Sequence, residues 1–159
     1  MAREEHEKIG ADIPTKVRQP DRVVDESQEI IDGVCFEHRL LHSAETEDAL
    51  TVALPDAGAI IVQDLVYNHA HLFLGERHFD SWRAALKQYR DLPYDIVLPG
   101  HGLPGDKALY HGMIDYLDFA EHALKESSTA AEFKQRILGR YPEYGSSRVL
   151  DHQLRFLFP

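Results

Sequence analysis

The chain has 159 residues, of which 43% are hydrophobic, so it can bury one core but is short for two ordinary domains. Its 27 acidic and 17 basic side chains give a formal net charge of −10, which repels nucleic acid and anionic lipid surfaces. One cysteine excludes a disulfide framework within the chain, and the charged start, MAREEHEKIGADIP, predicts neither a signal peptide nor a membrane span. We expect a single-domain cytoplasmic protein without nucleic-acid or membrane partners.

The first half of the sequence predicts strands. Residues 1–28 are charged and lack periodicity, so we expect an irregular lead-in there. In the stretch EIIDGVCFEHRLL, an Asp-Gly pair at 32–33 separates two apolar runs, which predicts a tight hairpin. Two further strands are expected at 49–55 and 58–66, and the second is apolar at successive positions, as in a strand buried on both faces.

The second half is mainly helical. A helix is predicted over 80–90, because its apolar residues recur at the spacing of one buried face. A short buried strand follows at 94–99, then a long helix over 106–125. A capping pattern predicts a helix over 129–140, and the apolar stretch RVLDHQLRFLF predicts a last one. This order of strands, helix, strand and helices indicates a layered α/β protein.

Two polar side chains stand at the ends of buried strands. Asp64 follows the run AIIVQ, and His101 follows DIVLPG, between two glycines. Taken singly, Asp64 is as consistent with a turn or cap, and His101 with an ordinary loop histidine. Together, a carboxylate oxygen and an imidazole nitrogen at adjacent strand ends form part of a Zn²⁺, Mn²⁺ or Fe site.

The run LTVALPDAGAIIVQDLVY, an amphipathic helix and then DIVLPGHG resemble the second half of the metallo-β-lactamase fold, a superfamily of metal-dependent hydrolases. The resemblance implies half of an αββα sandwich, with mainly one mixed or antiparallel sheet and flanking helices. Residues 29–126 would form this half, and residues 127–159 a C-terminal helical extension packed on the same domain. By this resemblance Asp64 matches the metal-bridging aspartate and His101 the last metal-binding histidine.

The chain also departs from that family. The His-x-His-x-Asp-His motif of the family's first half, which supplies most of the metal ligands, is absent. The nearest string, His69-Ala70-His71, comes after Asp64 and is interpreted as a coincidence in a loop that lines a cleft. In the full fold, Tyr67, Asn68 and His69 are candidates for lining the substrate cleft.

A middle histidine is expected in the family shortly before the strand LTVALP. That place falls on Glu45-Thr46, so Glu45 is a tentative oxygen ligand, and His42 is a weaker candidate. The family's Gly-Asp pair is Gln63-Asp64 in this chain, which is a milder change.

A catalytic zinc takes about three protein ligands and a water. With Asp64, His101 and tentatively Glu45, we expect the isolated chain to bind zinc, manganese or iron weakly or not at all. The first hypothesis is therefore a metallo-β-lactamase-like hydrolase or its truncated relative, with an incomplete site and weak or no activity alone. Its parent chemistry is attack of a metal-activated water on an ester, lactone, thioester, amide or phosphoester.

The predicted strands account for little more than one sheet, which leaves an apolar face and an open edge to be covered. A homodimer about a two-fold axis and a separately encoded first half would each cover them. A third alternative is that the chain is an expressed fragment or a decayed gene product. The second hypothesis for function is accordingly a non-catalytic module for dimerisation or partner binding, derived from that fold.

Overall fold

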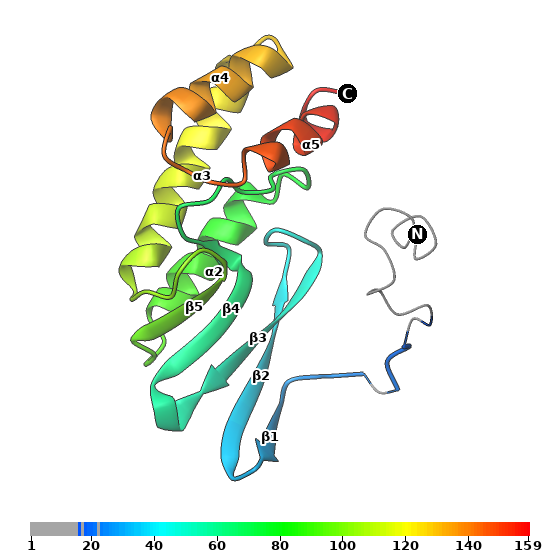
Figure 1. Cartoon of the computed structure of the whole chain (residues 1–159), viewed down its shortest axis with the longest axis vertical. Coiled ribbons are helices and arrows are strands. Elements are labelled where there is room, and N and C mark those ends of the chain that lie inside the picture. The colour runs from blue at the N-terminus through cyan, green and yellow to red at the C-terminus, as the bar shows by residue number, and fades with distance from the viewer. Residues whose placement is uncertain (1–15, 17, 22) are drawn as a thin grey trace.

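The computed structural model describes residue 16, residues 18–21 and residues 23–159, so most of the predicted lead-in at 1–28 lies outside the described residues. Five strands and four α-helices follow one another along the described chain (Figure 1). Their bounds are β1 Ser27–Ile31, β2 Val34–His42, β3 Asp48–Leu54, β4 Ala59–Tyr67, α2 Phe79–Arg90, β5 Ile96–His101, α3 Ala108–Glu126, α4 Ala130–Arg140 and α5 Ser147–Leu157.

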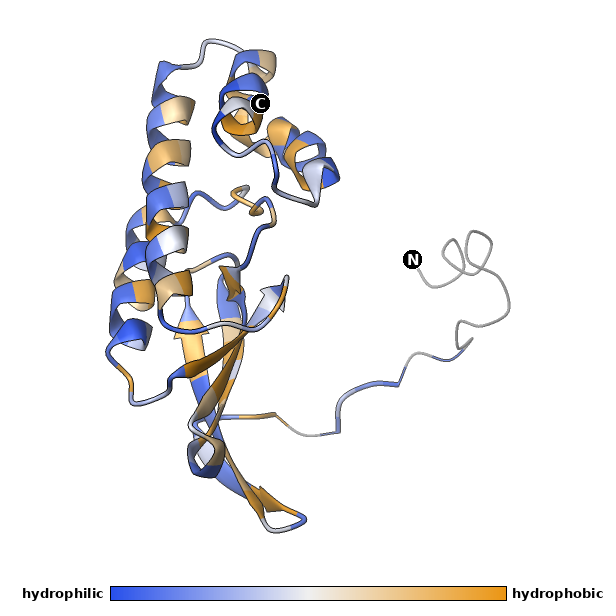
Figure 2. Cartoon of the chain, turned by 60° about the vertical axis from the view of Figure 1, so that its left-hand side comes forward, coloured by the Kyte–Doolittle hydropathy of each residue, from blue (hydrophilic) through white to orange (hydrophobic). Residues whose placement is uncertain are grey.

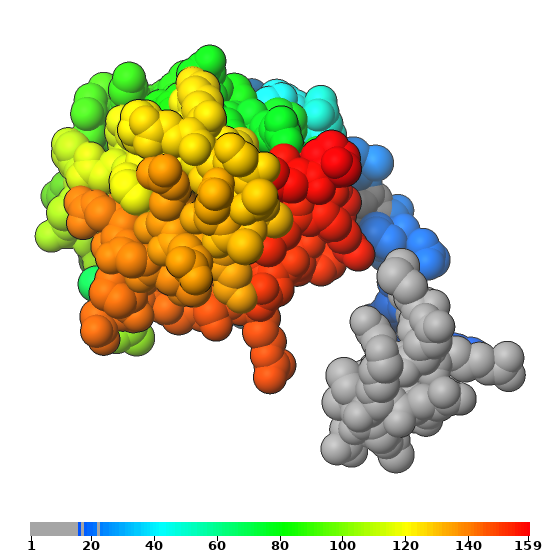
Figure 3. All heavy atoms as spheres, turned by 90° about the horizontal axis from the view of Figure 1, so that it is seen from above, coloured from blue at the N-terminus to red at the C-terminus, as the bar shows by residue number. Residues whose placement is uncertain are grey.

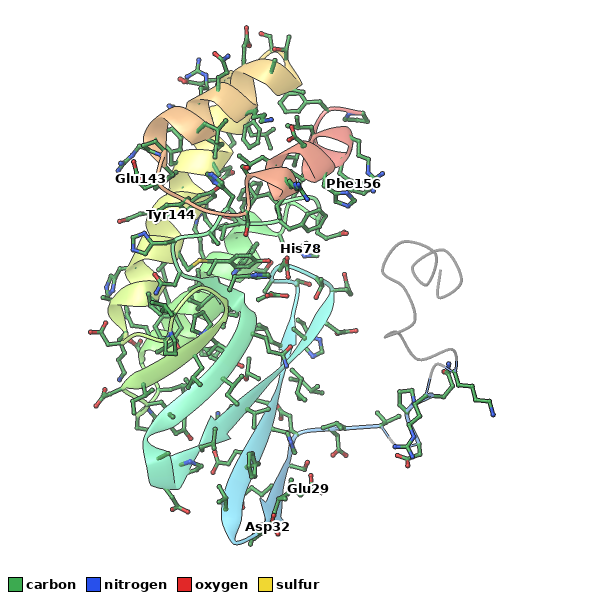
Figure 4. The ribbon with its side chains drawn as sticks, viewed as in Figure 1. Glu29, Asp32, His78, Glu143, Tyr144 and Phe156 are labelled. Atoms are coloured by element: carbon green, nitrogen blue, oxygen red, sulfur yellow. The ribbon has the colours of Figure 1, made fainter. Side chains whose placement is uncertain are left out.

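The strands form one mixed sheet in the order β1-β2-β3-β4-β5, in which only β4 and β5 are parallel. The β1–β2 hairpin turns through Asp32 and Gly33, whose φ angles of 51° and 83° are the left-handed values of a tight hairpin turn. Figure 4 labels Asp32 at the tip of this hairpin. The hairpin and the mixed sheet with flanking helices are as predicted from the sequence.

Helices α2 and α3 cover one face of the sheet (Figure 2). The predicted apolar stripe of α2 is buried against it, and the Trp82 indole donates a 2.9 Å hydrogen bond to the carbonyl of Leu65 on β4. The Tyr89 hydroxyl lies 2.8 Å from the Thr51 hydroxyl on β3. On this face Ala53, Ile60 and Val97, one from each of three neighbouring strands, are fully buried. The helix-covered face is therefore the core of the protein.

The opposite face of the sheet is apolar and is not covered by a helix of the described chain. The register places Leu40 beside Leu50, and Val52 beside Ile61, in rows that cross the sheet on this side. Leu40 is 38% exposed and Ile96, at the β5 end, is 49% exposed. The apolar face expected from the sequence is thus present in the described residues.

The C-terminal helices pack on the same core. Phe133, Ile137 and Leu150 are fully buried in one hydrophobic cluster with residues of the sheet and of α3. Seen from the end of the molecule, α4 and α5 lie beside the last turns of α3 (Figure 3). None of the helices in the described part of the chain has the length and apolar character needed to cross a bilayer.

Candidate functional site

Asp64 and His101 lie side by side. They are carried by β4 and β5, which are parallel neighbours, so residues toward the carboxyl ends of both strands reach the same edge of the sheet. The Asp64 Oδ1 and His101 Nε2 atoms are 3.4 Å apart, and each side chain is about half exposed. The two residues singled out in the sequence therefore form one pair that is open to solvent.

Two glycines allow this approach. A Cβ at Gly100 would lie 2.1 Å from Asp64 Oδ1, so only a residue without a side chain leaves room for the carboxylate. Gly102 has a φ of +89°, and a Cβ there would lie 2.0 Å from the carbonyl oxygen of Asn68. The glycines on either side of His101 thus let β5 pass directly against Asp64 and the segment after β4.

An irregularity in β4 aims Asp64 toward β5. The register of the β4–β5 pair shifts on both sides of Gln63, whose φ of 46° is in the left-handed region. A non-glycine residue is uncommon in that region, because its Cβ crowds the backbone there. Gln63 therefore introduces local backbone strain at this position.

Two further side chains, Tyr67 and Glu45, contact this pair or each other beside it. The Tyr67 ring stacks on the His101 ring, with centroids 4.7 Å apart and planes 21° apart. The Tyr67 hydroxyl donates a 2.5 Å hydrogen bond to Glu45. The pKa of Glu45 is raised to about 7, mainly because the carboxyl is buried; the hydrogen bond from Tyr67 opposes this effect and the nearby Asp64 carboxylate adds to it. The pKa of the Tyr67 hydroxyl is raised, first by burial and then by Glu45.

Glu45 and His42 occupy different places relative to the pair. Glu45 faces Asp64, but its carboxyl is bonded to Tyr67. His42 lies opposite Asp48 on the β2–β3 pair, with its Nδ1 2.6 Å from the Asp48 carboxylate. The structure thus brings the tentative ligand next to Asp64 and gives the weaker candidate another partner.

The Asp64–His101 pair fits two positions of a metal site. Two donors bonded to a tetrahedral zinc at about 2.1 Å lie about 3.4 Å from each other, which is the separation of this oxygen and nitrogen. Among the described residues, no group of three or more histidine, cysteine, aspartate or glutamate side chains is arranged to hold a metal ion. The pair therefore fits part of a zinc, manganese or iron site, and metal binding remains a prediction.

A cavity of about 210 Å³ lies next to this pair. Tyr67 connects the two, because it lines the cavity and its ring stacks on His101. Its wall includes all three cleft candidates, Tyr67, Asn68 and His69, together with the first turns of α3 and Tyr144. Asn68 is fixed there by two 2.8 Å hydrogen bonds, from its backbone N–H to the His101 carbonyl and from its side chain to the Leu103 carbonyl. Their role toward a substrate remains a prediction.

Two residues near this cavity were given no individual role from the sequence. Tyr144 lies between α4 and α5 (Figure 4), and its ring is 5.4 Å from that of His69 and 5.9 Å from that of Tyr116. His71 is fully buried, with Nδ1 3.0 Å from the Tyr116 hydroxyl, and Nε2 has no hydrogen-bond partner among the described residues. Burial lowers the pKa of His71. No local pattern distinguishes either residue, because both interact only across the fold.

Comparison with known structures gives the fold. A metallo-beta-lactamase from Pontibacter korlensis is 22% identical, with a TM-score of 0.55 over 74% of this chain and 54% of its own. A metallo-beta-lactamase family protein from Thermus thermophilus is 15% identical, with a TM-score of 0.61 over 87% of this chain and 50% of its own. A beta-lactamase domain protein from Burkholderia ambifaria is also 15% identical, with a TM-score of 0.59 and coverages of 88% and 46%.

These alignments leave much of the larger proteins without a counterpart. The chain spans about half the length of the solved structures that it matches. No protein-family model and no curated protein matches it. The chain therefore has the fold of part of a metallo-β-lactamase domain.

Proposed function

We propose that the chain supplies part of the metal site of a metal-dependent hydrolase, with Asp64 and His101 as two of the ligands. The observation that carries the proposal is the 3.4 Å approach of a carboxylate oxygen and an imidazole nitrogen at half-exposed positions. The cost of building that approach supports it, because Gly100 and Gly102 are both needed to accommodate it.

Glu45 is the tentative third ligand, because its carboxyl already faces Asp64. To bind a metal, it would have to give up the hydrogen bond from Tyr67. A bound zinc, manganese or iron ion would activate water and polarise the bond to be cleaved in an ester, lactone, thioester, amide or phosphoester. With so few ligands, weak or no hydrolysis by the chain alone is expected.

Zinc titration of the purified protein tests this proposal, and the chain offers a matched control. His42 and Asp48 form a second exposed histidine–aspartate pair, with side chains 67% and 73% exposed. We expect Asp64→Ala and His101→Ala each to weaken zinc binding at least about tenfold, and His42→Ala and Asp48→Ala to leave it unchanged. Equal zinc affinity in all four variants would contradict the proposal.

A second candidate function is supported by the uncovered sheet face. Its rows of Leu40, Leu50, Val52 and Ile61 form an apolar surface of the kind that mediates association. We propose that a second copy of this chain covers it, because a two-fold axis pairs the same surface with itself. A separately encoded first half is the competing occupant, and either would make the chain a binding module.

The mass in solution distinguishes these arrangements. We expect light scattering to give a dimer for the wild-type protein, and Val52→Lys to give a monomer by placing a charge in the contact. Leu103→Lys is the control, since Leu103 is 78% exposed outside the sheet. A wild-type protein that is monomeric at every concentration would contradict the homodimer.

A further inference from the structure

We propose that the cavity between the segment after β4 and the start of α3 binds an uncharged group of about the size of an aromatic ring. Tyr67 lines the cavity, and its ring also stacks on His101. None of Asp64, His101 and Glu45 lines it, so the inference does not depend on metal binding.

The chemistry of the wall indicates an uncharged ligand. Leu72, Leu109 and Met113 supply apolar surface, and Tyr116 and Tyr144 supply aromatic surface. Among the described residues, no lysine, arginine, aspartate or glutamate belongs to the wall, and its polar groups are those of Asn68, His69 and the tyrosine hydroxyls. A carboxylate or phosphate that entered would lose water without meeting a lysine or an arginine, which is unfavourable. A neutral aromatic or short aliphatic group would lose only apolar contact with water.

Backbone hydrogen bonds hold the wall in place. The Gly145 N–H donates to the His69 carbonyl at 2.9 Å, and the His71 N–H donates to the Gly145 carbonyl at 3.0 Å. These bonds tie the segment that carries Tyr144 to the segment that carries His69, so the aromatic side of the cavity is fixed before a ligand binds. A preformed wall reduces the ordering cost of binding.

The volume and one glycine set the size of the ligand. A cavity of about 150 Å³ suffices for benzene in a protein interior, and this one measures about 210 Å³. Gly112 lines it from α3, and a Cβ at Gly112 would meet no atom within 4 Å. A ring therefore fits, and the space beside Gly112 is large enough to be filled by a side chain.

Substitution of Gly112 by a larger residue tests whether the ligand binds in this cavity. Gly112 is exposed and lines the cavity, so Gly112→Leu would add an apolar side chain at the open side of the cavity. Gly139→Leu is the matched control, because Gly139 lies within α4, also has no atom within 4 Å of an added Cβ, and does not line the cavity. Both substitutions replace a helical glycine, so both variants should be at least as stable as the wild type.

The probes are benzyl alcohol and benzoate, which share a ring and differ in charge. In the metal-free protein, we expect benzyl alcohol to shift the amide NMR signals of Gly112, Met113 and Tyr144, and benzoate to bind at least tenfold more weakly. Gly112→Leu should weaken benzyl alcohol binding at least tenfold, and Gly139→Leu and Asp64→Ala should not change it.

Three outcomes would overturn the proposal. They are the absence of benzyl alcohol binding by the wild type, equal binding by Gly112→Leu, and equal binding of benzoate. A loss of zinc binding with retained benzyl alcohol binding, or the reverse, separates this inference from the proposed metal site.

Discussion

The protein contains two histidine–aspartate pairs that differ in their surroundings. His42 and Asp48 approach to 2.6 Å across an antiparallel pair of strands, and both side chains are largely exposed. His101 and Asp64 are farther apart, at 3.4 Å, but they lie on neighbouring parallel strands, His101 at the end of β5 and Asp64 in the second half of β4. The His42–Asp48 contact is thus the shorter one, but its two side chains are the more exposed.

The longer contact is built into the fold. Gly100 makes room for the Asp64 carboxylate, and the Tyr67 ring stacks on His101. In the described part of the chain, neither a glycine contact nor a stacked ring fixes the pair of His42 and Asp48, which is explained as a surface pair that contributes little to stability. The surroundings of such a pair, more than the distance between its atoms, therefore indicate a site that is prepared for a ligand.

The largest expected effect comes from Gly100→Ala. The new Cβ would lie 2.1 Å from Asp64 Oδ1 and 2.7 Å from the Gln63 carbonyl carbon, so strand β4 or Asp64 must move. We expect the free energy of unfolding in urea to fall by about 3 kcal/mol and zinc binding to be lost.

Gly33→Ala in the hairpin turn is the control for Gly100→Ala. It also replaces a glycine, at a φ of +83°, but has no atom within 4 Å of the new Cβ. A loss of about 1 to 2 kcal/mol from backbone strain is expected there, with zinc binding retained. Normal zinc binding by a folded Gly100→Ala protein would remove the distinction between the two pairs.

The buried His71 extends the comparison to pH. Burial lowers its pKa from the ordinary value of 6.5, so the unfolded chain takes up a proton at a higher pH than the folded protein does. Its contribution to stability is therefore complete above pH 6.5 and is lost as the pH falls from there toward the lower folded pKa, by at most about 1.4 kcal/mol per pH unit.

His71→Gln should flatten this pH dependence between pH 7 and pH 5 in urea unfolding. His111→Gln, on the exposed side of α3, serves as the reference substitution, because it makes the same change of residue type at an exposed position. An identical slope for His71→Gln and the wild type would mean that His71 does not carry this effect.

The smallest expected effect is that of Gln63→Gly, at the irregularity that aims Asp64. A glycine at this position would relieve the strain of the φ of 46°, at the cost of more backbone freedom in the unfolded chain, so a net stabilisation of up to about 1 kcal/mol is expected. Thermal unfolding measures it, with Gln63→Ala as a comparison that keeps the strain. A destabilised Gln63→Gly protein would show that the Gln63 side chain itself is needed.

The sequence allowed the elements and the main pair to be predicted, because these depend on local periodicity and on strand ends. The stripe of α2 and the Asp-Gly turn at 32–33 are examples, and Asp64 and His101 were singled out because each follows an apolar strand pattern. Strand β5 differs in its bounds: it runs through His101, whereas the strand was predicted to stop at 99.

The remaining features depend on contacts between distant parts of the chain. The bond between Tyr67 and Glu45 joins residues 22 positions apart, and the bond between His71 and Tyr116 joins residues 45 apart. Tyr144 reaches the cavity only because α4 and α5 fold back on α3. A local pattern carries no information on such contacts, so neither the supporting shell of the pair nor the full wall of the cavity could be predicted.

The most direct test of the proposed site is a crystal structure of the zinc-soaked protein, with anomalous diffraction measured at the zinc edge. We predict an anomalous peak within about 2.3 Å of both Asp64 Oδ1 and His101 Nε2. A peak at His42 and Asp48 in its place, or no peak near Asp64 and His101 at saturating zinc, would contradict the assignment of this pair as metal ligands.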